Sequence, residues 1–147
     1  MKYFISILLC IAVVCSLPAQ TRSPKRGVGF NFTNDADLQA LQPGTSWFYN
    51  WGTTPNNVVN TYNSVYGYEF CPMAWNGGYK ASDIRTYVQA HPDCKYILAF
   101  NEPNFNSQAN MTPQQAAAAW PAFWPSSPWC VLIREACLCH FFFIDIL

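Results

Sequence analysis

Charged residues are scarce in this chain, and neither sign dominates. Only 11% of its 147 residues are Asp, Glu, Lys or Arg, with 8 basic residues against 8 acidic ones. No block of like charges occurs, so electrostatics gives no reason to expect nucleic acid or an anionic membrane as a partner. A disordered chain is also disfavoured, because 51% of the residues are hydrophobic and can form a buried core.

The residues that cofactor and metal sites need are also rare or wrongly spaced. The two histidines, His91 and His140, lie near no Ser, Cys or Asp pattern typical of a catalytic triad. No Gly-x-Gly-x-x-Gly follows the first strand-like run, and no other phosphate-binding loop occurs. Cys137-x-Cys139-His140 has neither the cysteine spacing nor the four ligands of an ordinary zinc site. We therefore expect neither a cofactor nor a metal ion.

Aromatic residues, in contrast, are abundant. They make up 17% of the chain and include 6 Trp. A chain with no net charge and many aromatic rings suits a neutral ligand that is bound by stacking, and a polysaccharide is one such ligand. The alternative is that these rings fill the core.

A hydrophobic run occupies the N-terminus. Lys2 provides a short basic segment, residues 4–14 are apolar apart from Ser6, and Leu17-Pro18-Ala19 resembles a cleavage site. The run is shorter than the ~20 residues that cross a bilayer, so a signal peptide over residues 1–19 is favoured over a membrane anchor. We expect a secreted, extracellular protein without membrane association after cleavage, and a polar linker over residues 20–25.

The 7 cysteines divide by region. Cys10 and Cys15 lie in the predicted signal peptide, and three more lie after residue 129. Cys71 and Cys94 lie in the body of the chain, where they could form a disulfide in an oxidising compartment or remain two buried thiols. The sequence leaves both alternatives open.

Strand-like and helix-like segments alternate along residues 26–125. The strand-like runs are short and rich in aromatic or branched residues, and they cover residues 27–31, 46–51, 68–75 and 96–101. The helix-like segments have apolar residues at helical spacing, and they cover residues 34–41, 55–65, 82–90 and 112–120. Each helix-like segment begins with a residue that favours a helix start, in order Asn34, Pro55, Ser82 and Thr112.

Strict alternation with short connections implies parallel strands covered by helices. A doubly wound sheet and a (β/α)8 barrel both fit, but the missing dinucleotide motif argues against the former. A (β/α)8 (TIM) barrel takes about 250 residues, so four βα units correspond to its N-terminal half. We therefore predict an α/β fold that contains roughly the first four βα units of a parallel (β/α)8 barrel over residues 26–125, monomeric if complete.

Residues 126–147 break this pattern. They show neither period-2 alternation nor clear helical spacing, and no turn signals divide them. We interpret them as an anomalous tail translated from a retained intron or a shifted reading frame, with a genuine C-terminal tail as the alternative. Without further strands the first and fourth strands would be unpaired edges, and the chain would be poorly stable.

The strongest candidate for chemistry is Glu102, which directly follows the fourth strand-like run. Parallel barrels place catalytic groups at the carboxyl ends of their strands. Apolar surroundings favour the protonated form of a carboxyl group, which a general acid needs. The neighbouring Asn101 could donate a hydrogen bond to a sugar hydroxyl. The alternative is a loop carboxylate that caps the next turn.

Four motifs of this chain, in order and spacing, resemble glycoside hydrolase family 128. They are Gly27-Val28-Gly29-Phe30-Asn31, Trp47-Phe48-Tyr49-Asn50-Trp51, Phe70-Cys71-Pro72-Met73-Ala74-Trp75 and Leu98-Ala99-Phe100-Asn101-Glu102-Pro103-Asn104. The resemblance covers residues 26–125. It implies a small barrel that cleaves β-1,3-glucan with retention, with Glu102 as the acid/base and Asn101 in contact with the substrate 2-hydroxyl.

The resemblance also implies that aromatic residues at the strand ends line a groove for a β-glucan polysaccharide or oligosaccharide. Trp51 and Trp75 are the best candidates, because each ends its strand. Tyr49 shares a face with Trp51, since strand side chains alternate, and we place it in the substrate site together with Asn31. Trp47 lies on the same face, and we favour a core position for it.

A second carboxylate is missing from this prediction. Retaining glycosidases need one about 5–5.5 Å from the first. The resemblance places it at the end of a seventh strand, which this chain lacks. Glu69 begins the third strand, ~20 Å away at the opposite end of the barrel at ~3.3 Å per residue. Four aspartates belong to helices or their ends, namely Asp35, Asp37, Asp83 and Asp93.

The leading interpretation is a secreted member of a retaining β-1,3-glucanase family whose present chain is truncated and inactive. A non-catalytic β-glucan-binding protein is one alternative. An incomplete gene product without a function of its own is the other.

Overall fold

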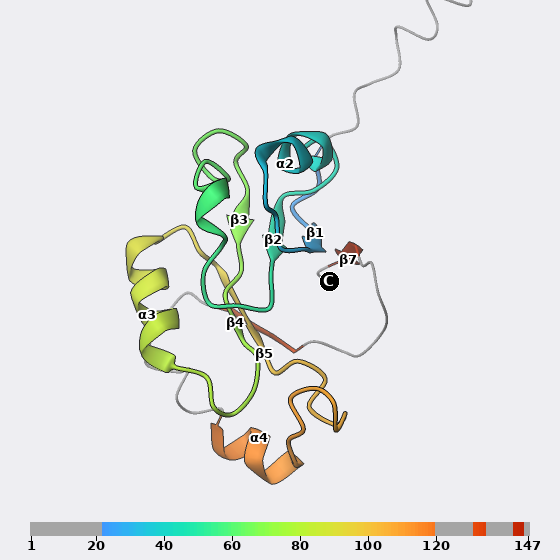
Figure 1. Cartoon of the computed structure of the whole chain (residues 1–147), viewed down its shortest axis with the longest axis vertical. Coiled ribbons are helices and arrows are strands. Elements are labelled where there is room, and N and C mark those ends of the chain that lie inside the picture. The colour runs from blue at the N-terminus through green and yellow to red at the C-terminus, as the bar shows by residue number, and fades with distance from the viewer. Residues whose placement is uncertain (1–21, 120–130, 135–142, 146–147) are drawn as a thin grey trace, which may run out of the picture.

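The structure of this chain, a computed structural model, describes residues 22–119, 131–134 and 143–145 (Figure 1). The predicted signal peptide and most of the predicted tail lie outside these residues. Within the described part, the elements in chain order are β1 (Arg26–Gly29), α2 (Asp35–Leu41), β2 (Trp47–Tyr49), the 3-10 helix η1 (Asn57–Val59), β3 (Glu69–Phe70), β4 (Met73–Ala74), α3 (Ala81–Ala90), β5 (Tyr96–Ala99), α4 (Pro113–Ala119), β6 (Val131–Arg134) and β7 (Phe143–Asp145).

The predicted α/β alternation with parallel strands is confirmed. β1 pairs with β2, β2 with β3 and β4 with β5, all in parallel register. In Figure 1, α3 runs beside β4 and β5, and α2 lies at the opposite end of the molecule from α4. None of the helices in the described residues has the length and apolar character to cross a membrane.

The expectation of unpaired edges is wrong. β7 pairs with β1 in antiparallel register, with Asp145 opposite Arg26, and β6 pairs with β5 in parallel register, with Val131 opposite Tyr96. Backbone pairing needs only extended N–H and C=O groups, so a segment without side-chain alternation can still occupy an edge. Both outer strands of the parallel set therefore have neighbours.

The third predicted strand, residues 68–75, is interrupted. Its two halves, β3 and β4, belong to different sheets, ordered β3-β2-β1-β7 and β4-β5-β6. Pro72 lies at the interruption, and its ring leaves it without an N–H for a ladder. Hydrogen bonds still run to both sides, because Met73 N–H donates to Gly52 O (2.8 Å) and Leu98 N–H donates to Pro72 O (2.9 Å). The two sheets therefore continue into each other.

Side chains alternate along the strands between two hydrophobic clusters. The helix-side cluster combines strand residues with residues of the helices and their connections, namely Phe32, Leu38, Phe48, Val59, Tyr62, Tyr68, Phe70, Ala74, Ile84, Tyr87, Val88, Cys94, Ile97, Ala99 and Phe100. The inner cluster lies on the other face of the strands and consists of Trp47, Tyr49, Cys71, Met73 and Leu98. In β2, Phe48 belongs to the helix-side cluster, whereas Trp47 and Tyr49 belong to the inner cluster. The alternation of side chains predicted from the sequence is therefore present.

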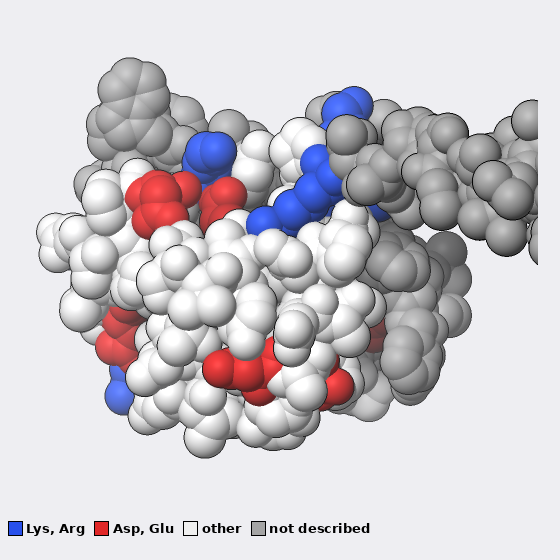
Figure 2. Space-filling view, turned by 90° about the horizontal axis from the view of Figure 1, so that it is seen from above, with Lys and Arg blue, Asp and Glu red and all other residues white. Residues whose placement is uncertain are grey.

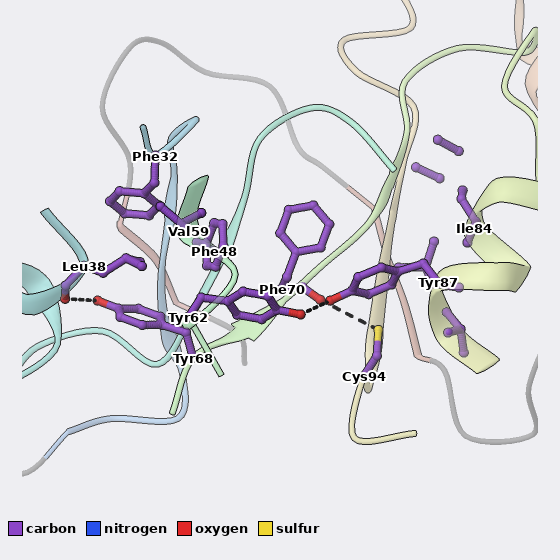
Figure 3. Packing of buried hydrophobic residues seen from close by; sticks show 14 of the residues in the cluster. Phe32, Leu38, Phe48, Val59, Tyr62, Tyr68, Phe70, Ile84, Tyr87 and Cys94 are labelled. Atoms are coloured by element: carbon purple, nitrogen blue, oxygen red, sulfur yellow. Dashed lines mark hydrogen bonds between the residues drawn. The ribbon is translucent and has the colours of Figure 1, made fainter. Parts of the chain in front are cut away.

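Edge-to-face aromatic contacts hold the helix-side cluster together. Phe48 contacts Phe32, Tyr62 and Phe70 with ring centroids 5.1, 5.5 and 5.1 Å apart. Figure 3 shows the hydroxyl groups of Tyr62 and Tyr87 pointing toward each other, and their oxygens are 2.6 Å apart. Burial raises the pKa of both tyrosines, so both phenols are neutral and each can donate or accept in this pair.

In the inner cluster, Trp47 packs against the backbone of the neighbouring strand. Its side chain is 1% exposed, which confirms the predicted core position. Gly27 pairs with Trp47 across β1 and β2, and a Cβ atom at Gly27 would lie 2.1 Å from the indole ring. The absence of a side chain at Gly27 therefore creates the space that the ring fills.

Cys71 and Cys94 are two buried thiols rather than a disulfide. Cys71 belongs to the inner cluster and Cys94 to the helix-side cluster. Their side chains therefore pack in separate clusters, in agreement with two thiols that are not joined.

The helix predicted over residues 55–65 is wrong. Only the short η1 forms there, followed by turns. Of the apolar side chains expected on one face, Val59 and Tyr62 are buried, whereas Val58 and Val65 are 59% and 62% exposed. The Asn56 side chain accepts a hydrogen bond from Val58 N–H, and such local bonds compete with a regular helix.

The other helix starts are mostly as predicted. Asn34 caps α2 by accepting from Asp37 N–H (3.1 Å). Thr112 caps α4 by accepting from Gln115 N–H (3.2 Å), and the Gln115 side chain accepts from Thr112 N–H (2.8 Å), which completes a capping box. The predicted cap of α3 at Ser82 is wrong, because α3 begins at Ala81 and the Ser82 hydroxyl donates to Asp83 instead.

Candidate active site

The carboxyl ends of the parallel strands bring the predicted site residues to one edge. We call this the carboxyl edge and define it by Phe30, Asn31, Asn50, Trp51, Trp75, Asn101 and Glu102. Asn50 Nδ2 donates to Asn31 Oδ1 (3.3 Å), which links the ends of β1 and β2. Asn101 N–H donates to Trp75 O (2.9 Å), which links the ends of β4 and β5.

Glu102 lies near the start of the loop between β5 and α4. Figure 1 shows the path of this loop from β5 to α4. The backbone of Glu102 is left-handed (φ 41°), and its side chain is half-buried. Non-glycine residues in this region are strained, and such residues are concentrated at functional sites. The turn is closed by Phe105 N–H, which donates to Glu102 O (3.0 Å).

Asn101 is buried, with 7% of its surface exposed, and its side chain is held by the same loop. Asn101 Nδ2 donates to Gln108 Oε1 (2.7 Å), and Ala109 N–H donates to Asn101 O (3.1 Å). These two contacts close the base of the loop that carries Glu102. The orientation of the Asn101 amide is therefore fixed by Gln108, a residue that the sequence did not single out.

Trp51 is the most accessible of the predicted aromatic site residues. It is 41% exposed, and it lies edge-to-face against Tyr49, with ring centroids 5.2 Å apart. Tyr49 itself is 4% exposed and lies in the inner cluster, so it can support Trp51 but offers little surface of its own. Trp75 is half-buried and packs against the same cluster.

None of the other acidic residues among residues 22–119 belongs to the set that defines the carboxyl edge. Glu69 accepts a hydrogen bond from Lys95 N–H, just before β5 begins, so it lies at the amino end of the strands as predicted. Burial raises the pKa of the Glu69 carboxyl, and the bond from Lys95 opposes this shift. Asp35, Asp37 and Asp83 lie in the first turns of α2 and α3. No second carboxylate at the carboxyl edge is found among residues 22–119.

The face of the molecule in Figure 2 carries side chains of both charges. Figure 2 shows small groups of acidic and basic side chains separated by uncharged residues. Among the seven residues that define the carboxyl edge, only Glu102 carries an acidic or basic side chain. A ligand of this edge would therefore be held by stacking and hydrogen bonds. Within the described residues, no three His, Cys, Asp or Glu side chains are grouped so that they could hold a metal ion.

Residues 27–126 match the Glycosyl hydrolase catalytic core family. The chain belongs to this family. The match runs from Gly27 in β1 to beyond α4, so it includes every residue of the carboxyl edge. A comparison with curated proteins finds no match.

Solved structures similar to this glycosyl hydrolase chain are endo-β-1,3-glucanases of glycoside hydrolase family 128. The enzyme from Pseudomonas viridiflava is 41% identical with a TM-score of 0.71 over 76% of this chain and 45% of its own. The enzyme from Sorangium cellulosum is 30% identical with a TM-score of 0.64 over 79% of this chain and 48% of its own. A variant from Amycolatopsis mediterranei, solved with laminaritriose and laminaribiose, is 25% identical with a TM-score of 0.54 over 70% of this chain and 39% of its own. The chain thus spans less than half the length of these enzymes.

Proposed function

We propose that this chain forms the acid/base side of a retaining β-1,3-glucan-cleaving site on the first four βα units of a (β/α)8 barrel. Glu102 is the proton donor and acceptor, and Asn101 binds the 2-hydroxyl of the sugar. The observation that carries this proposal is the position of Glu102. It follows a buried parallel strand in strained backbone geometry, inside the segment that matches the hydrolase family.

Trp51, Trp75, Tyr49 and Asn31 complete the proposed substrate surface. The exposed face of Trp51 stacks on a sugar ring, and the half-buried Trp75 borders the same edge. Solved relatives bind laminaritriose and laminaribiose, which are short β-1,3-glucans. A neutral glucan fits an edge whose only ionisable group is Glu102, because nothing there attracts a charged ligand.

Retaining hydrolysis requires a second carboxylate about 5–5.5 Å from Glu102. Among residues 22–119, Glu69 lies at the amino end of the strands, and the aspartates lie in the first turns of α2 and α3 or, as Asp93, bonded to Asn63 Nδ2 (2.8 Å). We expect none of them to act as the second carboxylate. We therefore expect that the 147-residue chain binds β-1,3-glucan but hydrolyses it poorly or not at all. A non-catalytic glucan-binding function is the second candidate, and the same observation favours it.

Two measurements on the purified chain test these proposals. Titration calorimetry compares laminarihexaose with cellohexaose, which differs in linkage, and a reducing-end assay follows laminarin. Binding of laminarihexaose without release of sugar is the expected result. Release of sugar that is lost in Glu102→Gln would establish catalysis by this chain, and release that persists in this variant would exclude Glu102. Failure to bind laminarihexaose would refute the proposed substrate class.

Secretion remains a proposal on the strength of residues 1–19, which precede the described residues. Expression of the full chain in a secreting host, followed by N-terminal sequencing, tests it. A mature N-terminus at residue 20 or 21 is expected, whereas retention of Met1 would contradict the proposed signal peptide.

A further inference from the structure

The Asn50 side chain makes three hydrogen bonds at the end of β2. Its Oδ1 accepts from Gly52 N–H (3.0 Å), and its Nδ2 donates to Thr54 O (3.0 Å) and to Asn31 Oδ1 (3.3 Å). One half-buried amide thus joins the end of β1, the end of β2 and the loop that follows. Trp51 lies between Asn50 and Gly52, inside the turn that these bonds close.

The backbone of Trp51 needs such support. Its φ angle is 63°, in the left-handed region that costs an L-residue about 1–2 kcal/mol. The hydrogen bond from Gly52 N–H to Asn50 Oδ1 spans Trp51 and forms an Asx-turn, which fixes the direction of the chain across the strained residue. Gly52 O in turn accepts from Met73 N–H (2.8 Å), so the turn is attached to β4 as well.

The position of the Trp51 ring depends on this backbone. The ring lies edge-to-face on Tyr49, and Tyr49 lies over Gly29, where a Cβ atom would be 2.8 Å from the tyrosine ring. Tyr49 is thus a buried support, and Trp51 is the exposed side chain that stands on it. A relaxed backbone at Trp51 would turn the indole away from this support.

We infer that Asn50 is a positioning residue that holds the Trp51 ring at the carboxyl edge for stacking on a sugar ring of β-1,3-glucan. This inference rests on the proposed function. It assigns to Asn50 a role distinct from binding, because the hydrogen bonds of its amide go to the protein and its effect on the ligand passes through Trp51.

A double-mutant cycle on the full chain tests this inference. Binding of laminarihexaose is measured by calorimetry for Asn50→Leu, Trp51→Ala and the double variant. Each single variant is expected to bind roughly tenfold or more weakly, as for a central tryptophan contact, and the double variant about as weakly as Trp51→Ala. Asn56→Leu is the matched control, because Asn56 makes the same type of bond to Val58 N–H (3.2 Å) in η1. It should leave binding unchanged.

A second variant covers the case in which Asn50→Leu does not fold. Asn50→Asp keeps an acceptor for Gly52 N–H and loses the donor to Thr54 O and Asn31 Oδ1, so it should bind laminarihexaose roughly threefold more weakly. Combined with Trp51→Ala, it should cause no loss beyond that of Trp51→Ala alone. Losses that multiply in either double variant would overturn the inference, and so would unchanged binding in Asn50→Leu. If the wild-type chain does not bind laminarihexaose, the proposed function fails and this inference fails with it.

Discussion

Replacing Gly27 by alanine tests the packing on which the inner cluster depends. A Cβ atom at this position would lie 2.1, 2.2 and 2.3 Å from three carbons of the Trp47 indole. Carbon atoms pack at about 3.5–4.0 Å, so the ring or the strand would have to move by about 1.5 Å. The Trp47 side chain is 1% exposed, so solvent offers its ring no space to move into. Overpacking of this kind costs about 1–3 kcal/mol, and we expect the upper end of this range.

Urea denaturation, monitored by circular dichroism, measures the expected loss of unfolding free energy. A loss of about 3 kcal/mol is large beside a total stability of about 5–15 kcal/mol. Gly44→Ala is the matched control, because its Cβ would be 3.8 Å from the nearest atom, Leu41 O, and it should be neutral or stabilise by about 0.4–1 kcal/mol. Equal stability of Gly27→Ala and the wild type would refute the packing argument.

A second substitution separates the clash from a general intolerance of strand residues. Trp47→Leu removes the ring, so adding Gly27→Ala to it should cost at least about 1 kcal/mol less than adding it to the wild type. An undiminished cost would mean that Gly27 is needed for another reason.

Three further predictions concern single side chains. Glu102→Gly should be about 1 kcal/mol more stable than Glu102→Ala in urea denaturation. Both variants lack the carboxylate, but only glycine relieves the strain of the left-handed backbone (φ 41°). Equal stability of the two variants would argue against strain. Burial raises the pKa of the Glu69 carboxyl, so the stability that this group contributes is fully present below its unfolded-state pKa near 4.5 and is lost as pH rises through its folded-state pKa. Glu69→Gln should remove this fall in the free energy of unfolding. An unchanged dependence of stability on pH in the variant would contradict the prediction. Thr112→Ala should weaken α4 by about 1 kcal/mol, which would be seen as roughly fivefold faster amide exchange in residues 114–119. Global stability should not change, since α4 buries no residue, and unchanged exchange would exclude the cap.

Much of the fold could be predicted because strand patterns are local. Phe48 and its neighbours Trp47 and Tyr49 divide between two clusters as alternation requires. The helix expected over residues 55–65 does not form, because asparagine side chains there bond to nearby backbone groups. Asn56 accepts from Val58 N–H, and Asn63 donates to Tyr68 O. Helical spacing of apolar residues did not reveal this competition.

The sequence predicted that the proposed site residues lie together at one edge, but it did not predict the contacts that support them. Asn101 and Glu102 could be placed because parallel strands bring their carboxyl ends to one edge. Gln108 could not, since its bond to Asn101 depends on how a seven-residue stretch folds back on itself. Asn50 had a weak signal, because Asn50-Trp51-Gly52 is a turn-favouring pattern inside a motif chosen for its aromatic residues.

Backbone strain is concentrated at the same edge as the proposed chemistry. Among the described residues, the non-glycine positions with positive φ are Trp51, Glu102 and Asn110, and the first two are proposed site residues at strand ends. Glycine would be less costly at either position, and asparagine tolerates this conformation better than tryptophan or glutamate does. A large ring and a carboxylate therefore occupy positions that the backbone alone would give to other residues. Stability does not explain that choice, whereas the proposed display of a stacking surface and a proton donor beside a glucan would.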